Sequence, residues 1–152
     1  MKPGKVRPIA ICVFRNKGKI LLSKGYDEVK DQDFFRPLGG RIEFGEKGDQ
    51  TVKRELYEEL KLEVSQLQYL GTLENIFIYN GQKGHEIILV YDGKFKDSET
   101  YNLTELYGME NEDEPIHAMW KPISDFKTKT PKKKKTKIPP LYPDGLYELL
   151  MD

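Results

Sequence analysis

The 152-residue sequence contains little cysteine, no long apolar run and no net charge. Its single cysteine, Cys12, has no partner for a disulfide within the chain, which excludes a disulfide-stapled scaffold and is typical of a reducing compartment. Because Cys12 lies in the apolar run Ile9–Phe14, we expect its side chain to be buried in a strand. No apolar run approaches the roughly 20 residues of a membrane-spanning helix, and Ile9–Phe14 is too short for the apolar core of a signal peptide. These absences predict a cytoplasmic protein with no membrane partner.

The formal net charge of zero hides an uneven distribution of charge along the chain. Residues 127–137 contain seven lysines and no acidic residue, so the remaining residues carry a net charge of about −7. A body of that charge repels an anionic substrate unless a metal ion and a few placed cations hold it. The lysine tract lacks interleaved aromatic residues on which single-stranded bases stack, so nucleic acid is not expected as the partner. We favour a solvated loop, with weak electrostatic binding of RNA or phosphate as the alternative.

Length and composition predict a single domain over residues 1–152, because 38% hydrophobic and 33% charged residues can bury one core but not two. The expected strands are Val6–Arg15, Lys19–Gly25, Leu67–Leu73, Glu74–Tyr79, His85–Phe95 and Ile116–Lys121, with a hairpin turn over residues 80–84. The expected helices begin at Gly48 or Asp49 and cover Tyr142–Leu150. The expected loops are Tyr26–Phe35 and Asp97–Glu114, the second with a short helix around Thr104–Tyr107. This order predicts a mixed sheet between helices.

The most informative segment is Gly40–Leu62, in which acidic residues recur along one short helix. Residues three and four apart share a helix face, so Glu55 projects beside Glu58 and Glu59. Three carboxylates this close repel one another unless a cation compensates them, and hard oxygen ligands suit Mg²⁺ or Mn²⁺ and not zinc. A solvated helix face that pairs with Arg54 is the plainer alternative.

The residues upstream of this helix favour the metal-binding interpretation. The segment resembles the Nudix box, whose pattern is Gly, five residues, Glu, seven residues, Arg-Glu, an aliphatic residue, any residue, Glu-Glu, any residue, Gly and an aliphatic residue. The matching residues are Gly40, Glu46, Arg54, Glu55, Leu56, Glu58, Glu59 and Leu62. At ordinary residue frequencies, a chance match of this quality is rarer than about one in a million. Lys61 stands where the family has glycine, and a left-handed conformation there costs a non-glycine residue roughly 1 kcal/mol.

The resemblance implies an α/β fold, the Nudix-type α/β/α sandwich with a mixed central sheet, in which the box forms a loop, a helix and a second loop. It also implies a Mg²⁺ site, with Mn²⁺ as the alternative ion. The implied metal ligands are the carboxylates of Glu55, Glu58 and Glu59 and the backbone carbonyl of Gly39 or Gly40. Arg54 is implied to orient the carboxylates without touching the substrate, and Glu46 to fix the loop against the helix.

The general base has two candidate positions, because family members differ in where they place it. A metal ion lowers the pKa of the attacking water before any base acts. Glu55 is the candidate within the box, whereas Glu112 and Glu114 lie on the loop before the last expected strand. Ordinary loop acidity is the favoured interpretation of that second pair.

Two arginines beside the glycine turn, Arg36 and Arg41, are candidates for substrate binding. Guanidinium groups bind phosphates bidentately, so either side chain could clamp a diphosphate. Solvation at the surface is an equal alternative for both.

The sequence predicts a Mg²⁺-dependent hydrolase that cleaves the diphosphate linkage of a nucleoside diphosphate joined to another group. The alternative is a Nudix-like module that senses a nucleotide without cleaving it, although such a module is expected to lack a metal glutamate. Tyr79, 17 residues past the box, matches a tyrosine of dinucleoside polyphosphate hydrolases and gives a weak indication of such a substrate or of a nucleoside triphosphate. The first proline after the box is Pro115, which disfavours ADP-ribose.

Overall fold

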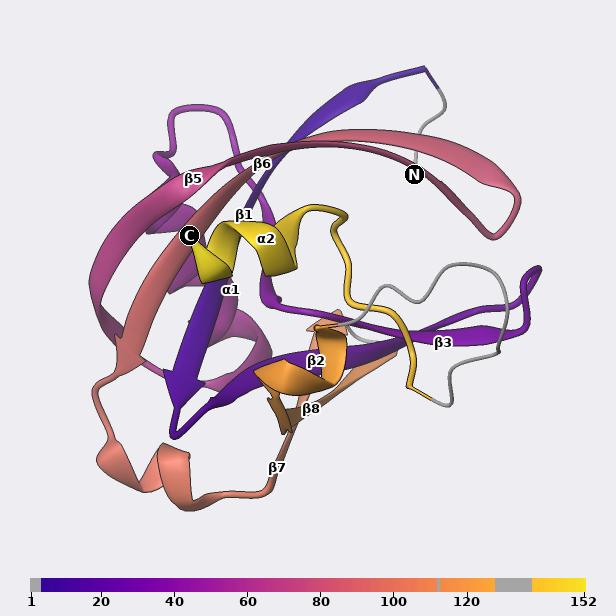
Figure 1. Ribbon diagram of the computed structural model, residues 1–152. Helices are drawn as coiled ribbons and strands as arrows, with labels where there is room; N and C mark the ends of the chain where they lie inside the picture. Colours follow the sequence, from indigo (N-terminus) through magenta and orange to yellow (C-terminus); the bar gives the residue numbers. More distant parts are fainter. Residues whose placement is uncertain (1–3, 112, 128–137) are drawn as a thin grey trace.

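The computed structural model describes residues 4–111, 113–127 and 138–152, so Glu112 and nearly all of the lysine tract lie outside the described residues. The strands are β1 (Val6–Asn16), β2 (Lys19–Asp27), β3 (Gln32–Arg36), β4 (Leu38–Arg41), β5 (Val64–Tyr79), β6 (Gln82–Phe95), β7 (Glu105–Asn111) and β8 (Glu114–Pro122). The helices are α1 (Gly48–Leu60), α2 (Leu146–Met151) and the 3₁₀ helices η1 (Ser98–Asn102) and η2 (Ile123–Phe126) (Figure 1). No helix in the described ranges has the length and apolarity needed to cross a bilayer.

The strands form one mixed sheet in the order β5-β6-β1-β2-β8-β7. β1 runs parallel to β6 and antiparallel to β2, but its pairing with β2 is confined to Arg15 with Ile20 and Asn16 with Lys19, beside the connecting turn. Beyond that turn the two strands diverge, because β4 pairs with β1 while β3 pairs with β2. Pro37, the only residue between β3 and β4, carries the chain from one group of strands to the other.

Helices cover both faces of the sheet, which confirms the predicted α/β/α sandwich (Figure 1). The alternation of apolar residues along β1 explains this arrangement, since successive side chains point to opposite faces of a sheet. Cys12 and its neighbours on one face pack with Val52 and Leu56 of α1. Val13 and its neighbours on the other face pack with Leu146 of α2. The expected burial of Cys12 is therefore correct.

Helix α1 begins at Gly48, as predicted, and the side chain of Gln50 accepts a 2.8 Å hydrogen bond from the Lys47 amide. The helix ends at Leu60, and Lys61 adopts the left-handed conformation with φ of 58°. This is the position at which the family has glycine, so the structure places the departure at the helix cap, as the sequence suggested.

Four sequence-based assignments of secondary structure are wrong. The expected loop Tyr26–Phe35 contains β3, whose polar residues pair with β2. The short helix expected around Thr104–Tyr107 is instead the start of β7, and the helical turn precedes it at η1. β5 is one long strand with bulges where two were expected. Helix α2 starts at Leu146, four residues later than the predicted helix.

Candidate active site

Arg54 fixes the loop before α1 to the helix. Its Nε and Nη2 atoms donate to the two carboxylate oxygens of Glu46 at 2.8 and 2.9 Å, and the Thr51 hydroxyl donates to Glu46 at 2.6 Å. These bonds, with Arg54 as the largest cause, lower the pKa of Glu46 to about 2. Glu46 therefore stays ionised at neutral pH and anchors the loop, which is the structural role expected for it.

The remaining donors of Arg54 reach the carboxylates of the predicted metal site. Its Nη1 atom donates to Glu55 at 2.8 Å and to Glu58 at 3.3 Å, and its Nη2 atom donates to the Arg41 carbonyl at 3.1 Å. The guanidinium thus contacts two of the three predicted ligands, in keeping with the orienting role implied by the resemblance. That role in catalysis stays a prediction.

Gly40 lets β4 pass directly against the carboxylate of Glu55. A Cβ atom at Gly40 would lie 2.6 Å from Glu55 Oε1, so any side chain there would displace the carboxylate. Burial raises the pKa of Glu55, whereas the hydrogen bond from Arg54 opposes that rise. The close approach brings the backbone of Gly40 and an acidic side chain together, as the predicted site requires.

Glu59 is the buried member of the acidic cluster. Its side chain lines the main cleft and the residue is only 5% exposed, whereas the side chain of Glu58 is 58% exposed. Burial first, and then the nearby charges of Glu55 and Glu110, raise the pKa of Glu59 to about 8. A bound cation would relieve this unfavourable environment for a carboxylate.

The donor set fits a hard divalent cation, although its side chains do not yet converge on one point. It consists of oxygen atoms only, includes a buried carboxylate and lies beside a glycine backbone, which suits Mg²⁺ or Mn²⁺. Within the described ranges, however, no three His, Cys, Asp or Glu side chains gather closely enough to hold an ion. Arg54 explains this, because it holds Glu55 and Glu58 through ion pairs. Coordination would require these carboxylates to rotate away from Arg54.

The main cleft has a volume of about 1240 Å³ and lies where β1 and β2 diverge. It brings together predicted site residues that are far apart in the sequence: Arg36, Gly40, Arg41, Glu59, Tyr79 and Glu114 all line it. This volume is somewhat above the roughly 300–1,000 Å³ of most small-molecule sites, so the cleft has room for a ligand with more than one group.

The three predicted substrate-binding residues lie on different strands of the cleft and make different contacts. Arg36 ends β3, and its positive charge opposes the rise in pKa that burial causes at Glu59 and Glu110. Arg41 lies in β4 on the wall of the cleft. The Tyr79 hydroxyl donates to the Tyr26 carbonyl at 3.3 Å, so this tyrosine already links the end of β5 to β2.

Glu110 is a site residue that the sequence did not reveal. It lies in β7 and lines the cleft. Its side chain is partly exposed, and the partial loss of its hydration raises its pKa. It shares a hydrogen bond with Glu114, the predicted outside base. The Asn111 amide and this bond lower the pKa of Glu114. Glu110 lies at an irregularity between the Met109–Pro115 and Asn111–Glu114 pairs of β7 and β8, so a regular strand assignment for residues 105–111 would not have placed its side chain.

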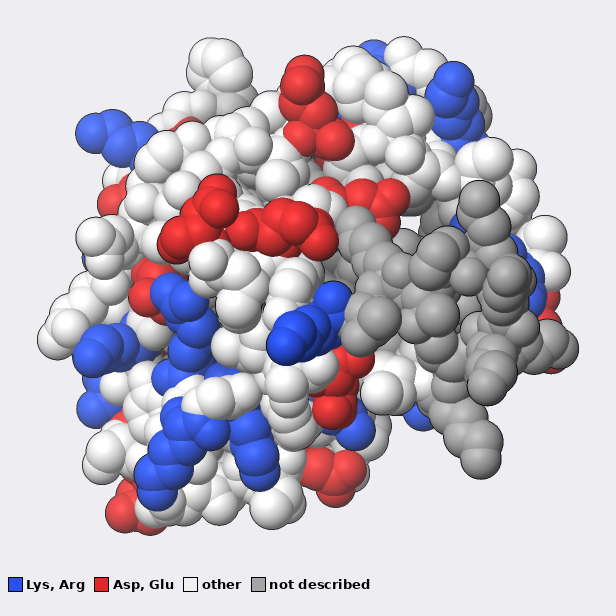
Figure 2. Space-filling model, in the orientation of Figure 1, with Lys and Arg blue, Asp and Glu red and all other residues white. Residues whose placement is uncertain are grey.

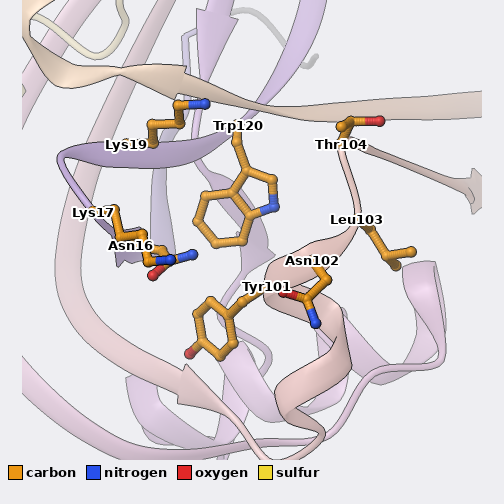
Figure 3. Close-up of a pocket in the computed structure, with 8 residues that line it drawn as sticks. All are labelled: Asn16, Lys17, Lys19, Tyr101, Asn102, Leu103, Thr104 and Trp120. Carbon is orange, nitrogen blue, oxygen red and sulfur yellow. The ribbon is translucent and has the colours of Figure 1, made fainter.

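A second, smaller pocket of about 360 Å³ lies elsewhere on the molecule, where the turn between β1 and β2 meets η1 (Figure 3). The rings of Trp120 and Tyr101 are 5.6 Å apart there, and Lys17 and Lys19 border the opening. None of the predicted site residues lines this pocket. It therefore takes no part in the carboxylate site.

Charges of the two signs gather in different regions of the face shown in Figure 2. Acidic side chains form a band over the region of α2, and lysine and arginine side chains gather lower, near the turn between β1 and β2. Among the described residues, this face does not offer one continuous basic surface to a polyanion.

Comparison with known proteins identifies the family. The model of the NUDIX domain family matches residues 4–144, so the chain belongs to the Nudix family. This confirms the enzyme class predicted from the box, a Nudix-type pyrophosphohydrolase.

Three solved structures have a similar fold. The E. coli ORF135 protein has 21% identity and a TM-score of 0.57, and the match covers 97% of this chain and 89% of that protein. A MutT NUDIX hydrolase from Burkholderia pseudomallei has 17% identity and a TM-score of 0.53, with coverage of 88% and 92%. A MutT protein from Bacillus halodurans has 18% identity and a TM-score of 0.52, with coverage of 78% and 70%.

Proposed function

We propose that the protein is a Mg²⁺-dependent hydrolase that cleaves the diphosphate linkage of a nucleoside diphosphate joined to another group. The observation that carries the proposal is the buried carboxylate of Glu59, which shares a large cleft with Arg36. Such a carboxylate beside other acids favours a cation, and a cation beside an arginine favours phosphate groups. Mn²⁺ is the alternative ion.

The residues divide into three roles under this proposal. Glu55, Glu58 and Glu59, with the backbone of Gly40, would hold the metal ion, while Arg36 and Arg41 would bind phosphate oxygens. When bound, the ion supplies charge neutralisation at the phosphates and lowers the pKa of the attacking water. Arg54 would orient the carboxylates through the hydrogen bonds described above.

Two positions for the general base remain candidates. Glu55 lies within the box, and Glu114 lies across the cleft with Glu110 as its hydrogen-bond partner. If Glu114 is the base, Glu114→Gln should lower kcat without weakening Mg²⁺ binding, whereas Glu55→Gln should weaken Mg²⁺ binding in either case because Glu55 is also a proposed metal ligand. If Glu55 is the base, Glu114→Gln should leave kcat nearly unchanged, and Glu55→Gln should lower kcat even at saturating Mg²⁺. We therefore propose measuring kcat and Mg²⁺ affinity in parallel for Glu55→Gln and Glu114→Gln. Equal and mild effects of both changes would mean that the water needs no protein base.

The proposal is tested by a hydrolysis screen in the presence of Mg²⁺ or Mn²⁺, in which the nucleotide products are separated and quantified by ion-exchange chromatography. The substrates are nucleotide sugars, dinucleoside polyphosphates, ADP-ribose and (deoxy)nucleoside triphosphates, and Glu59→Gln serves as the inactive control. We expect turnover of at least one diphosphate compound by the wild type and its loss in the variant. Tight nucleotide binding without turnover of any substrate would instead favour the sensing module.

A further inference from the structure

Three polar residues of the cleft lie side by side across neighbouring strands. Arg7 of β1 pairs in register with Glu86 of β6, and Glu86 pairs in register with Asn75 of β5. Residues directly opposite each other in a sheet project from the same face, so the three side chains form one row. All three line the main cleft. We call them the polar row.

The polar row has hydrogen-bonding groups that the described residues leave unpaired. An Arg7 Nη2 atom donates to Glu86 Oε2, but the Arg7 Nε atom is buried and has no partner among the described residues. Asn75 is 8% exposed, and within the same part of the chain its side-chain amide makes no hydrogen bond. Folded proteins satisfy the great majority of buried polar groups, so unpaired groups that line a cleft point to a ligand.

The walls around the polar row are apolar and aromatic. Ile9 and Ile88 follow Arg7 and Glu86 on the same face of the sheet. The Phe34 ring contacts the rings of Tyr142 and Tyr79, at centroid distances of 5.4 and 5.9 Å. Aromatic and aliphatic walls favour a flat apolar body, whereas the row favours a polar edge.

We propose that the polar row recognises the edge of a nucleobase and thereby determines which nucleotide is bound. The Asn75 amide offers both a donor and an acceptor, and the Glu86 carboxylate, which Arg7 holds, offers a further acceptor. This set complements a heterocycle that carries an acceptor beside a donor. A phosphate group fits poorly because the Glu86 carboxylate would repel it. A sugar would leave the aromatic wall without a flat partner.

The position of the row also agrees with a single substrate that spans the cleft. Arg7 is four residues before Ile11, which projects from the same face of β1, lines the cleft and pairs with Gly39 next to Gly40, and four strand residues span about 13 Å. A nucleoside joined to a diphosphate has a comparable length. The inference thus rests on the proposed function, because it assigns the base of that substrate to the row.

The test uses equilibrium binding of nucleoside 5′-monophosphates, which contain no anhydride bond and cannot be consumed by the proposed activity. The dissociation constants of AMP, GMP, CMP and UMP are measured by calorimetry and compared with that of ribose 5-phosphate, which lacks a base. For the wild type, we expect at least one nucleotide to bind more tightly than ribose 5-phosphate. Asn75→Leu should weaken the affinity for that nucleotide tenfold or more and change the affinity for ribose 5-phosphate less than twofold.

Thermal unfolding separates recognition from a structural role. Loss of an unpaired buried amide should leave Tm unchanged or raise it, although a residue needed for packing would lower it. Asn75→Ala is the second variant, in case leucine is too large, and Glu74→Leu is the matched control on the exposed face of β5. The control should preserve every affinity.

The inference is overturned if both Asn75 variants keep the nucleotide affinity or if they weaken the affinities for the nucleotide and for ribose 5-phosphate equally. It is also overturned if no nucleotide binds the wild type better than ribose 5-phosphate does. These outcomes are distinct from a failure of the proposed function. A protein that binds a nucleotide through Asn75 but hydrolyses no anhydride would refute only the proposed activity.

Discussion

At the residue scale, burial separates the acidic side chains of the site. Glu59 is enclosed, whereas Glu58 is mostly in solvent and pairs with Arg54. We predict that Glu58→Gln and Glu59→Gln each lower kcat at least a hundredfold, because each removes a charged metal ligand while preserving side-chain shape. Turnover at saturating Mg²⁺ and far-UV circular dichroism measure activity and folding. Near-normal rates for both variants would show that the ligand assignment is wrong.

Glu46 gives the fold a defined response to acid. Its pKa is about 2 in the folded protein against an ordinary value of 4.5, so its ionised form stabilises the fold above pH 4.5. That contribution is lost as the pH falls from 4.5 through 2, because the unfolded chain takes up the proton first. We predict that Glu46→Gln lowers Tm at pH 7 and that this difference shrinks between pH 4.5 and 2. A difference in Tm that is independent of pH would exclude an ionic role.

Lys61 is a single residue at which the sequence opposes the backbone. Its left-handed conformation favours glycine, so Lys61→Gly should stabilise the protein by up to about 1 kcal/mol. Lys53→Gly is the matched control, since the same change inside the exposed face of α1 should destabilise by about 1 kcal/mol. Denaturant unfolding measures both changes, and equal signs would contradict the cap interpretation.

At the scale of elements, β7 passes directly over the end of α1. A Cβ atom at Gly108 would clash with the Glu59 carbonyl and lie 2.6 Å from the Leu60 side chain. We predict that Gly108→Ala pushes β7 from the helix, lowers Tm by several degrees and reduces kcat, because Glu110 lies on the same strand. An unchanged Tm and kcat would show that the two elements tolerate separation.

The elements also show what the sequence could predict. Helix α1 was predictable because Val52 and Leu56 recur at helical spacing and the loop glycine precedes them. Strands β3 and β7 were not, because their residues are mostly polar, although each pairs with a strand close to it in sequence. β3 is completed by the Phe35 amide and carbonyl, which bond to the backbone of Pro140 and Tyr142. Such pairings override local propensity.

At the scale of the whole molecule, the site depends on topology as well as on the box. The box supplied Gly40 and Glu59, but only the fold brings Arg36 and Glu110 to them across three strands and a helix. Asn75 carried no sequence signal, because the role proposed for it rests on its place in the cleft, which only the fold reveals. Spacing along the chain thus predicted the chemistry, and long-range contacts determine the shape of the site.

The divergence of β1 and β2 has a mechanical consequence. The strand pairing between the two groups of strands is limited to residues beside one turn, and within the described strands the chain crosses between the groups at that turn, at Pro37 and through η1. A ligand that touches both Glu86 and Arg36 therefore cross-links two walls that are otherwise coupled by side chains. Amide hydrogen exchange should slow in β6 and β3 together when a nucleotide and Mg²⁺ are added, because their opening motions become one event. Protection confined to one wall would mean that the ligand does not bridge them.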